Sequence, residues 1–191
     1  VNYLGNIEWQ KLIDNTLIGF GLSCFSISQA SDSGYVASGY GTNAVLFKIN
    51  VNGDLLWVKT YPRLGLETRF WNHKITRDGG IIAVGDLNPP YEGRVVKTDK
   101  HGNVLWDSTY NYNLILSKII QSSFDQSYYF TVTTRITKID SIGRLIWSKP
   151  YDYIGGDILQ TQSGDIYTAT GNNAFYLNKV DTSGHLIWQK S

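Results

Sequence analysis

Residues 48–57 read KINVNGDLLW, and this ten-residue stretch recurs three times along the chain. The other copies are KTDKHGNVLW at 97–106, KIDSIGRLIW at 138–147 and KVDTSGHLIW at 179–188. Each copy has Lys first, Asn or Asp third, Gly sixth and Trp tenth. Near the N-terminus, Asn2, Gly5 and Trp9 stand at the same mutual spacing. The chain is therefore built on a tandem repeat.

The spacing of the repeat indicates the class of fold. Successive motif tryptophans are 41 to 49 residues apart, and a period in this range is typical of propellers and solenoids. Short alternating segments separated by Gly, Asp, Asn and Ser fill each unit, without the 3.6-residue period of helices. We therefore exclude helical repeats.

Each unit divides into four expected strands. In chain order they are 24–29, 34–40, 45–49 and 55–60; 73–76, 80–86, 94–98 and 104–108; 118–121, 128–133, 135–139 and 145–149; and 158–160, 165–169, 175–180 and 186–190. The joins between first and second strands, and between third and fourth strands, have the Asp, Asn and Gly chemistry of hairpin turns. Four antiparallel strands per unit predict the blades of a β-propeller.

We predict one all-β domain over 1–191, a propeller of four four-stranded antiparallel blades with an extra N-terminal strand motif. The repeats span about 20–61, 67–110, 114–151 and 153–191, with a partial repeat at 1–14. The partial repeat leaves three explanations open. The chain is a piece of a longer propeller, its end adds a strand to an edge, or two chains share blades.

The motif tryptophans suit the seams between blades, because each apolar blade face must be covered by its neighbour and a large flat ring fills such a seam. Truncating one to alanine is expected to cost about 3 to 5 kcal/mol. The residues to which we assign this structural role are Trp57, Trp106, Trp147 and Trp188, with the motif glycines Gly53, Gly102, Gly143 and Gly184.

The spacing Asp/Asn-x-x-Gly-x-x-x-Trp, followed by Lys-x-Tyr in 57–61 and 147–151, resembles the repeats of secreted bacterial β-propeller proteins. The motif is also similar to the tryptophan-docking repeat of quinoprotein-type propellers. Together with DSGYVASG at 32–39 and DGGIIAVG at 78–85, the likeness covers nearly the whole chain. The resemblance implies an extracellular or cell-surface setting in a bacterium, but no reaction. None of the cofactor-binding positions of quinoproteins is matched, so we expect no cofactor.

Composition limits the possible partners. The 191 residues include 17 basic and 16 acidic side chains, a net charge of +1, which gives no field that would favour nucleic acid or anionic membranes. No apolar run approaches the roughly 20 residues that span a bilayer. Cys24, the single cysteine, is expected to be a buried structural thiol. The absence of Met indicates a mature secreted protein or an excised piece.

Catalytic and metal sites find little support in the sequence. His73, His101 and His185 have no metal-ligand spacing, and His101 and His185 are expected to be exposed on turns. Residues 50–54 and 99–103 resemble the start of a calcium loop but lack its distal Glu, so hairpin turns are the better interpretation. We therefore assign no catalytic and no metal-binding residue. A carboxylate pair that is brought together by the blades stays possible.

The least repetitive segments, 63–71 and 87–94, are the best candidates for a binding surface, because rigid scaffolds commonly bind through their loops. They place Arg63, Arg69, Trp71, Tyr91 and Arg94 in one blade, and these residues could form an aromatic and basic patch. The alternative is that Trp71 only packs under its loop.

Two functions follow from these observations. The favoured one is a non-enzymatic module, secreted or on the cell surface, that binds a protein partner or joins a larger assembly, with oligomers possible through blade edges. The alternative is a carbohydrate-binding module or a polysaccharide-acting enzyme, suggested by the many aromatic residues. Protein binding requires an apolar patch with a polar rim.

Overall fold

The computed structural model describes residues 4–13, 21–89, 91–112, 116–152, 154–171 and 174–191. These residues form four antiparallel sheets of four strands each, and within each sheet the strands follow sequence order. The predicted fold of four four-stranded antiparallel blades is confirmed. Each sheet is a blade, numbered 1 to 4 along the chain.

The strands have the following bounds. Blade 1 contains β1 (Ser23–Gln29), β2 (Tyr35–Tyr40), β3 (Ala44–Ile49) and β4 (Leu55–Thr60). Blade 2 contains β5 (Glu67–Ile75), β6 (Ile81–Asn88), β7 (Glu92–Thr98) and β8 (Val104–Tyr110). Blade 3 contains β9 (Lys118–Gln121), β10 (Tyr128–Val132), β11 (Arg135–Ile139) and β12 (Leu145–Pro150). Blade 4 contains β13 (Asp157–Gln160), β14 (Ile166–Gly171), β15 (Phe175–Val180) and β16 (Leu186–Lys190).

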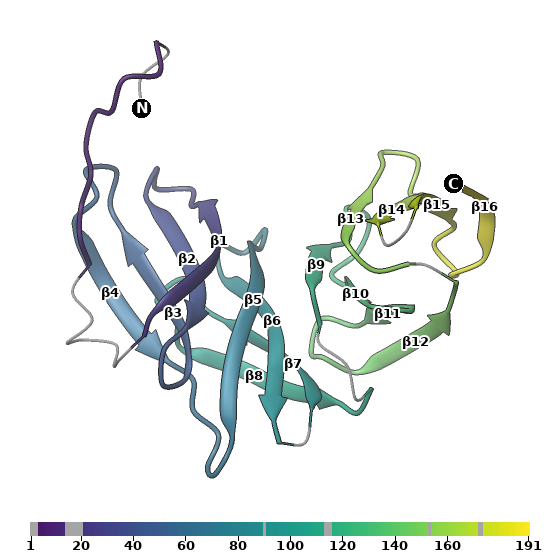
Figure 1. The fold of residues 1–191 in the computed structure, drawn as a ribbon, viewed down its shortest axis with the longest axis horizontal. Helices are drawn as coiled ribbons and strands as arrows, with labels where there is room; N and C mark the ends of the chain where they lie inside the picture. Colours follow the sequence, from purple (N-terminus) through teal and green to yellow (C-terminus); the bar gives the residue numbers. More distant parts are fainter. Residues whose placement is uncertain (1–3, 14–20, 90, 113–115, 153, 172–173) are drawn as a thin grey trace.

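The blades follow one another around an open arc, with blade 4 at one end and the N-terminal segment 4–13 at the other (Figure 1). The first strands line the inner side, since β1 contacts β5, β5 contacts β9, and β9 contacts β13. We call the face of a blade that is turned towards the next blade in sequence its trailing face, and the opposite one its leading face. Buried apolar clusters occupy the seams between blades 1 and 2, 2 and 3, and 3 and 4.

The turns before the last strands of the blades have the predicted chemistry. In blade 2 the Asp99 carboxylate accepts hydrogen bonds from the backbone N–H groups of His101 and Asn103, at 2.8 and 2.9 Å. The equivalent Asn or Asp of the other blades does the same. The motif glycine that follows has a positive φ, 76° at Gly102 and 83° at Gly143, which favours glycine.

A bulge in the last strand of every blade directs the tryptophan into the seam. In blade 2, Lys97 pairs with Trp106 and Thr98 with Val104, so that Leu105 is the extra residue. The other three blades have the same irregularity. A bulge increases the local twist and redirects the side chains beside it. The structural role that we assign to the motif tryptophans therefore depends on this bulge as well as on the ring.

The motif tryptophans of blades 1 to 3 each pack on the motif glycine of the next blade, a contact that we call the tryptophan clamp. A Cβ placed on Gly143 would lie 3.0 Å from the Trp106 ring, and one placed on Gly102 would lie 3.2 Å from Trp57. A tyrosine four residues after the tryptophan completes the clamp, because its hydroxyl donates to the carbonyl of the same glycine. The pairs are Tyr61 with Gly102 at 2.9 Å, Tyr110 with Gly143 at 2.6 Å, and Tyr151 with Gly184 at 2.7 Å.

Four sequence-based expectations need correction. Cys24 is exposed, because it lies on the edge strand β1, in which no residue is fully buried. Segment 63–71 is only partly a loop, since β5 begins at Glu67. Segment 87–94 is mostly strand, because β6 and β7 extend into it. Segment 4–13 contains no strand, although its Trp9 clamps Gly53.

His73 is expected to make the stability of the fold depend on pH. The ring is fully buried, its Nδ1 lies 2.8 Å from the Ser38 hydroxyl of blade 1, and its Nε2 has no hydrogen-bond partner among the described residues. Burial and the nearby Lys74 charge lower the pKa of His73 to about 4. Between pH 6.5 and 4 the unfolded chain therefore binds a proton that the folded chain rejects, which costs up to about 3 kcal/mol of stability as the pH falls.

Urea unfolding at pH 7 and at pH 4.5 measures this loss of stability. His73→Gln should show a clearly smaller loss than the wild type, because its side chain does not titrate in this range. Equal losses in both proteins would contradict the role of His73.

Candidate functional site

Two inner-strand bulges bring aromatic rings together at the seam between blades 1 and 2. The register of β1 with β2 shifts at Phe25, and the register of β5 with β6 shifts at Trp71. Each bulge therefore presents one extra aromatic residue on the inner strand. The centroids of these two rings lie 4.7 Å apart, and Tyr40 at the end of β2 contacts both. With Arg69 and Asp86, these residues form what we call the axial cluster.

The polar members of the axial cluster hold the aromatic rings in place. The Trp71 indole N–H donates to the Asp86 carboxylate, and the Arg69 guanidinium lies 5.4 Å from the centroid of the Tyr40 ring. Arg69 Nη1 also lies 3.6 Å from Asp86 Oδ2, which has no hydrogen-bond partner among the described residues. Asp86 is fully buried, and burial raises its pKa despite the Trp71 hydrogen bond and the Arg69 charge. Phe25 remains 45% exposed.

Arg63 and Arg94 form a separate group deeper in the same seam. Arg94 is 1% exposed and binds both carboxylate oxygens of Asp107, at 3.0 and 2.8 Å, while its Nη1 donates to the Tyr61 carbonyl at 2.6 Å. Arg63 contacts the same carboxylate at 3.0 Å. Burial opposes ionisation of Asp107, but the two arginines outweigh it and hold the pKa below its usual value. Arg94 therefore joins strands and blades and offers no surface to a ligand.

The five residues predicted as one patch thus divide in space. Arg69 and Trp71 belong to the axial cluster, whereas Arg63 and Arg94 converge on Asp107. Tyr91 belongs to neither group and lies 48% exposed at the turn between β6 and β7.

Sequence reasoning missed Phe25, Tyr40 and Asp86. A signal was present in Gly39 and Gly85, which are the last residues of the two similar stretches DSGYVASG (32–39) and DGGIIAVG (78–85). A Cβ on these glycines would lie 1.8 and 1.7 Å from a backbone oxygen of the bulged inner strand. Glycine at these positions is therefore what allows the bulges.

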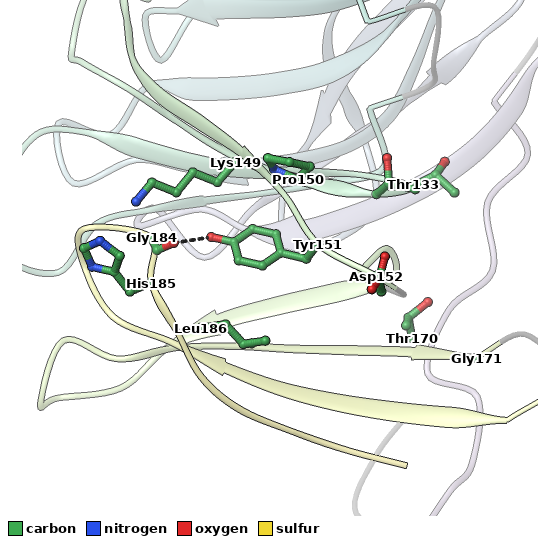
Figure 2. A pocket seen from close by; sticks show the side chains of 11 residues that line it. Thr133, Lys149, Pro150, Tyr151, Asp152, Thr170, Gly171, Gly184, His185 and Leu186 are labelled. Carbon is green, nitrogen blue, oxygen red and sulfur yellow. Dashed lines mark hydrogen bonds between the residues drawn. The ribbon is translucent and has the colours of Figure 1, made fainter.

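A groove of about 1300 Å³ opens between blades 3 and 4 (Figure 2). Tyr151 lies along its middle, with its hydroxyl on the Gly184 carbonyl. Asp152 and Thr170 lie at one end of the groove, and Lys149 and His185 at the other. Burial and the charge of Asp181 raise the pKa of Tyr151 to about 12, so the phenol stays neutral. Hydroxyl, carboxylate and cationic groups thus surround one aromatic ring.

Blade 4 differs from blades 2 and 3 beside this groove, because it lacks an arginine that those blades carry in their third strands. Arg94 stands three residues before the motif lysine of β7 and reaches the Tyr61 carbonyl across its seam. Arg135 has the same position in β11 and lies 5.6 Å from the Tyr112 ring centroid. In β15 this position is Tyr176. Among the described residues that line the groove beside Tyr151, none is an arginine.

Of the three histidines, only His185 lines one of these two regions, at one end of the groove. His101 and His185 are exposed on turns, as predicted, and His73 is buried in the seam between blades 1 and 2. Within the described ranges, no three His, Cys, Asp or Glu side chains come close enough to hold a metal ion. The same part of the chain contains no helix that could cross a membrane.

Comparisons with known proteins identify the architecture. No protein-family model matches the sequence, and no curated protein matches it. A solved structure of a protein of unknown function from Bacteroides caccae superposes with a TM-score of 0.70 at 16% identity, over 98% of this chain and 66% of its own. The structure of streptogramin B lyase superposes with a TM-score of 0.65 at 14% identity, over 87% of this chain and 53% of its own. BamB from Moraxella catarrhalis superposes with a TM-score of 0.54 at 15% identity, over 83% of this chain and 49% of its own.

The fold is a β-propeller. The chain forms four blades of four antiparallel strands each, and these blades superpose on solved structures that are propellers. The chain spans between about half and two thirds of the length of the three solved structures. At these identities the likeness concerns the fold alone.

Proposed function

We propose that this chain is a non-enzymatic protein-binding propeller, and that the axial cluster is its principal contact site. The observation that supports the proposal is the composition of the cluster, with Trp71, Tyr40 and Arg69 around a half-exposed Phe25. Tryptophan, tyrosine and arginine dominate the hot spots of protein interfaces. The Asp86 hydrogen bond and the two bulges hold the rings in place before any partner binds, which reduces the entropy lost on binding.

The propeller fold by itself does not select a function, because one of the similar structures is named as a lyase. The choice therefore rests on the site. In the described chain the only histidine near the axial cluster, His73, has its pKa lowered to about 4 and is enclosed in the core. A location outside a bacterial cell or on its surface is part of the proposal, and it rests on the resemblance of the repeats.

The test compares three single variants in affinity enrichment from the surface and culture-medium proteins of the source organism, with quantitative mass spectrometry. Phe25→Ala and Trp71→Ala should each reduce recovery of the specific partner at least tenfold, about 1.4 kcal/mol or more. Tyr91→Ala is the matched control, because its ring is equally exposed but lies outside the cluster, and it should bind like the wild type.

The thermal unfolding midpoint of each variant must be measured alongside, so that loss of binding is separated from loss of fold. If every recovered protein binds Phe25→Ala and Trp71→Ala as well as the wild type, the axial cluster is not the contact site.

The groove between blades 3 and 4 favours a second candidate, carbohydrate binding. Hydroxyls of Thr133 and Thr170, the Asp152 carboxylate and the Tyr151 ring line it together. Sugars bind where hydrogen-bonding groups lie beside an aromatic face. If this candidate is right, a panel of insoluble polysaccharides will deplete the protein from solution, and Asp152→Asn will prevent the depletion. Phe25→Ala will still be depleted by the polysaccharides, and this difference distinguishes carbohydrate binding from protein binding.

A further inference from the structure

The tryptophan clamp is made four times along the described chain, always in the same direction. Trp9 packs on Gly53, Trp57 on Gly102, Trp106 on Gly143, and Trp147 on Gly184. In each case the tryptophan lies on the motif glycine of the next turn in sequence. Trp188 ends the series, and no motif glycine follows it in this chain.

The trailing face of blade 4 repeats the chemistry of the trailing face of blade 3. In blade 3, Tyr129 pairs with Lys138, whose amine lies 5.1 Å from the tyrosine ring centroid, and Trp147 lies 5.9 Å from that ring. In blade 4, Tyr167 pairs with Lys179, with an amine-to-ring distance of 5.8 Å, and Trp188 lies 5.8 Å away. The two faces therefore suit the same kind of neighbour.

Only one of these two faces has a neighbour in the structure. Tyr129 and Ile136 of blade 3 are fully buried against Ile158, Ile166 and Val180, on the leading face of blade 4. On blade 4 itself the corresponding face is open, as Figure 1 shows at the end of the arc. There Leu177, the counterpart of Ile136, is 43% exposed, and Leu159 and Phe175 are 54% and 88% exposed.

The other end of the arc shows the complementary half of a clamp. Gly5 has a φ of +80°, close to the values of the clamped motif glycines. No described atom lies within 4 Å of a Cβ built on Gly5, so no tryptophan packs on it. Segment 4–13 covers part of the leading face of blade 1, where Ile13 packs on the cluster of Ala37, Phe47 and Ile49.

We infer that the trailing face of blade 4 is an interface for a further blade of the same repeat type, whose apolar leading face covers Tyr167 and Leu177 and whose turn glycine Trp188 clamps. Trp188 needs a glycine turn at the edge of a complete sheet to form a clamp. This requirement specifies a blade as the partner, whereas an apolar face alone would fit many proteins. The match of 98% of this chain to only 66% of the Bacteroides caccae structure fits an arc that continues beyond four blades.

A second copy of the chain offers no such blade. Its Gly53 is already clamped by its own Trp9, and Ile13 covers part of the leading face of its blade 1. Its Gly5 is free of tryptophan, but segment 4–13 contains no strand and so presents no sheet face to cover Tyr167 and Leu177. The surface differs from the axial cluster in position and in chemistry, so this inference does not depend on the proposed function.

The test extends the protein by one further blade, whose leading face is already described in the structure. In the extended chain a second copy of residues 151–191 follows Ser191, because the leading face of blade 4 already fits the trailing face of blade 3. The added Tyr151 then stands four residues after Trp188, as it does after Trp147. Trp188→Ala is compared in the parent and extended chains by thermal unfolding. We expect it to lower the midpoint of the extended chain by roughly 10 °C and that of the parent by less than about 3 °C.

Trp147→Ala is the matched control, because its clamp on Gly184 exists in both chains, and it should lower both midpoints to the same extent. An equal effect of Trp188→Ala in the two chains would overturn the inference, since Trp188 would then clamp nothing in the added blade. Light scattering of the parent chain supplies an independent readout, for which we expect a monomer. A stable dimer that Trp188→Ala dissociates would also overturn the inference, because a second copy would then cover the face.

Discussion

Trp106→Ala is expected to lower the free energy of unfolding by about 3 to 5 kcal/mol, the usual cost of removing a large aromatic ring from a core. The Trp106 ring packs against the buried cluster between blades 2 and 3 and stands over Gly143. Its indole N–H also donates to the Ser141 carbonyl at 2.9 Å, within the turn of the next blade. Alanine would remove the packing, leave a cavity and abolish this hydrogen bond together.

Urea unfolding followed by tyrosine and tryptophan fluorescence measures this loss. Gly143→Ala tests the other half of the clamp, because a methyl group there meets the Trp106 ring at 3.0 Å and the residue must keep a φ of +83°. Both variants should be destabilised, and the double variant should lose less than the sum, since the two changes affect one contact. A loss below about 1 kcal/mol for Trp106→Ala would mean that the seam does not depend on the ring.

Arg94→Ala is expected to destabilise the protein by a similar amount, about 3 to 5 kcal/mol, because it breaks a buried ion pair and leaves one charge without its main partner. The variant loses the two hydrogen bonds to Asp107 and the one to the Tyr61 carbonyl. The guanidinium also lies 5.9 Å from the Phe70 ring centroid, so packing is lost as well.

Arg63→Ala is the matched control, because Arg63 contacts the same Asp107 carboxylate but its side chain is 40% exposed. An exposed ion pair contributes at most about 1 kcal/mol. Equal losses for the two arginines, measured by urea unfolding, would contradict the buried role of Arg94. Arg94→Ala should also affect any binding activity only through stability, unlike Phe25→Ala.

Local chemistry explains why the strands and turns could be predicted from the sequence. Each of the sixteen described strands overlaps an expected one, because an Asx–glycine turn and an alternating segment depend only on neighbours along the chain. The largest error concerns β5, which starts six residues earlier than expected. Its first half holds Arg69 and Trp71 in a bulge, and a bulge interrupts the alternation on which the prediction relied.

The candidate site was only half predictable. Arg69 and Trp71 were identified because they depart from the repeat, yet Arg94 was placed beside them although it binds Asp107, thirteen residues away in the adjacent strand. Phe25 and Tyr40 were missed because they belong to another blade. Cys24 was expected to be buried because its neighbours in sequence are apolar, but it lies on an edge strand and is exposed.

The sequence by itself determined the repeat, the four-stranded blade, the glycine turns and the tryptophans of the seams, because these depend on periodicity and on conformational preferences of single residues. Only the tertiary structure decided which side chains meet across a seam, which seam stays open as a groove, and which face of the arc is left uncovered. These features arise between residues that are about 40 positions apart, and they depend on how one blade is rotated against the next, which no local pattern encodes.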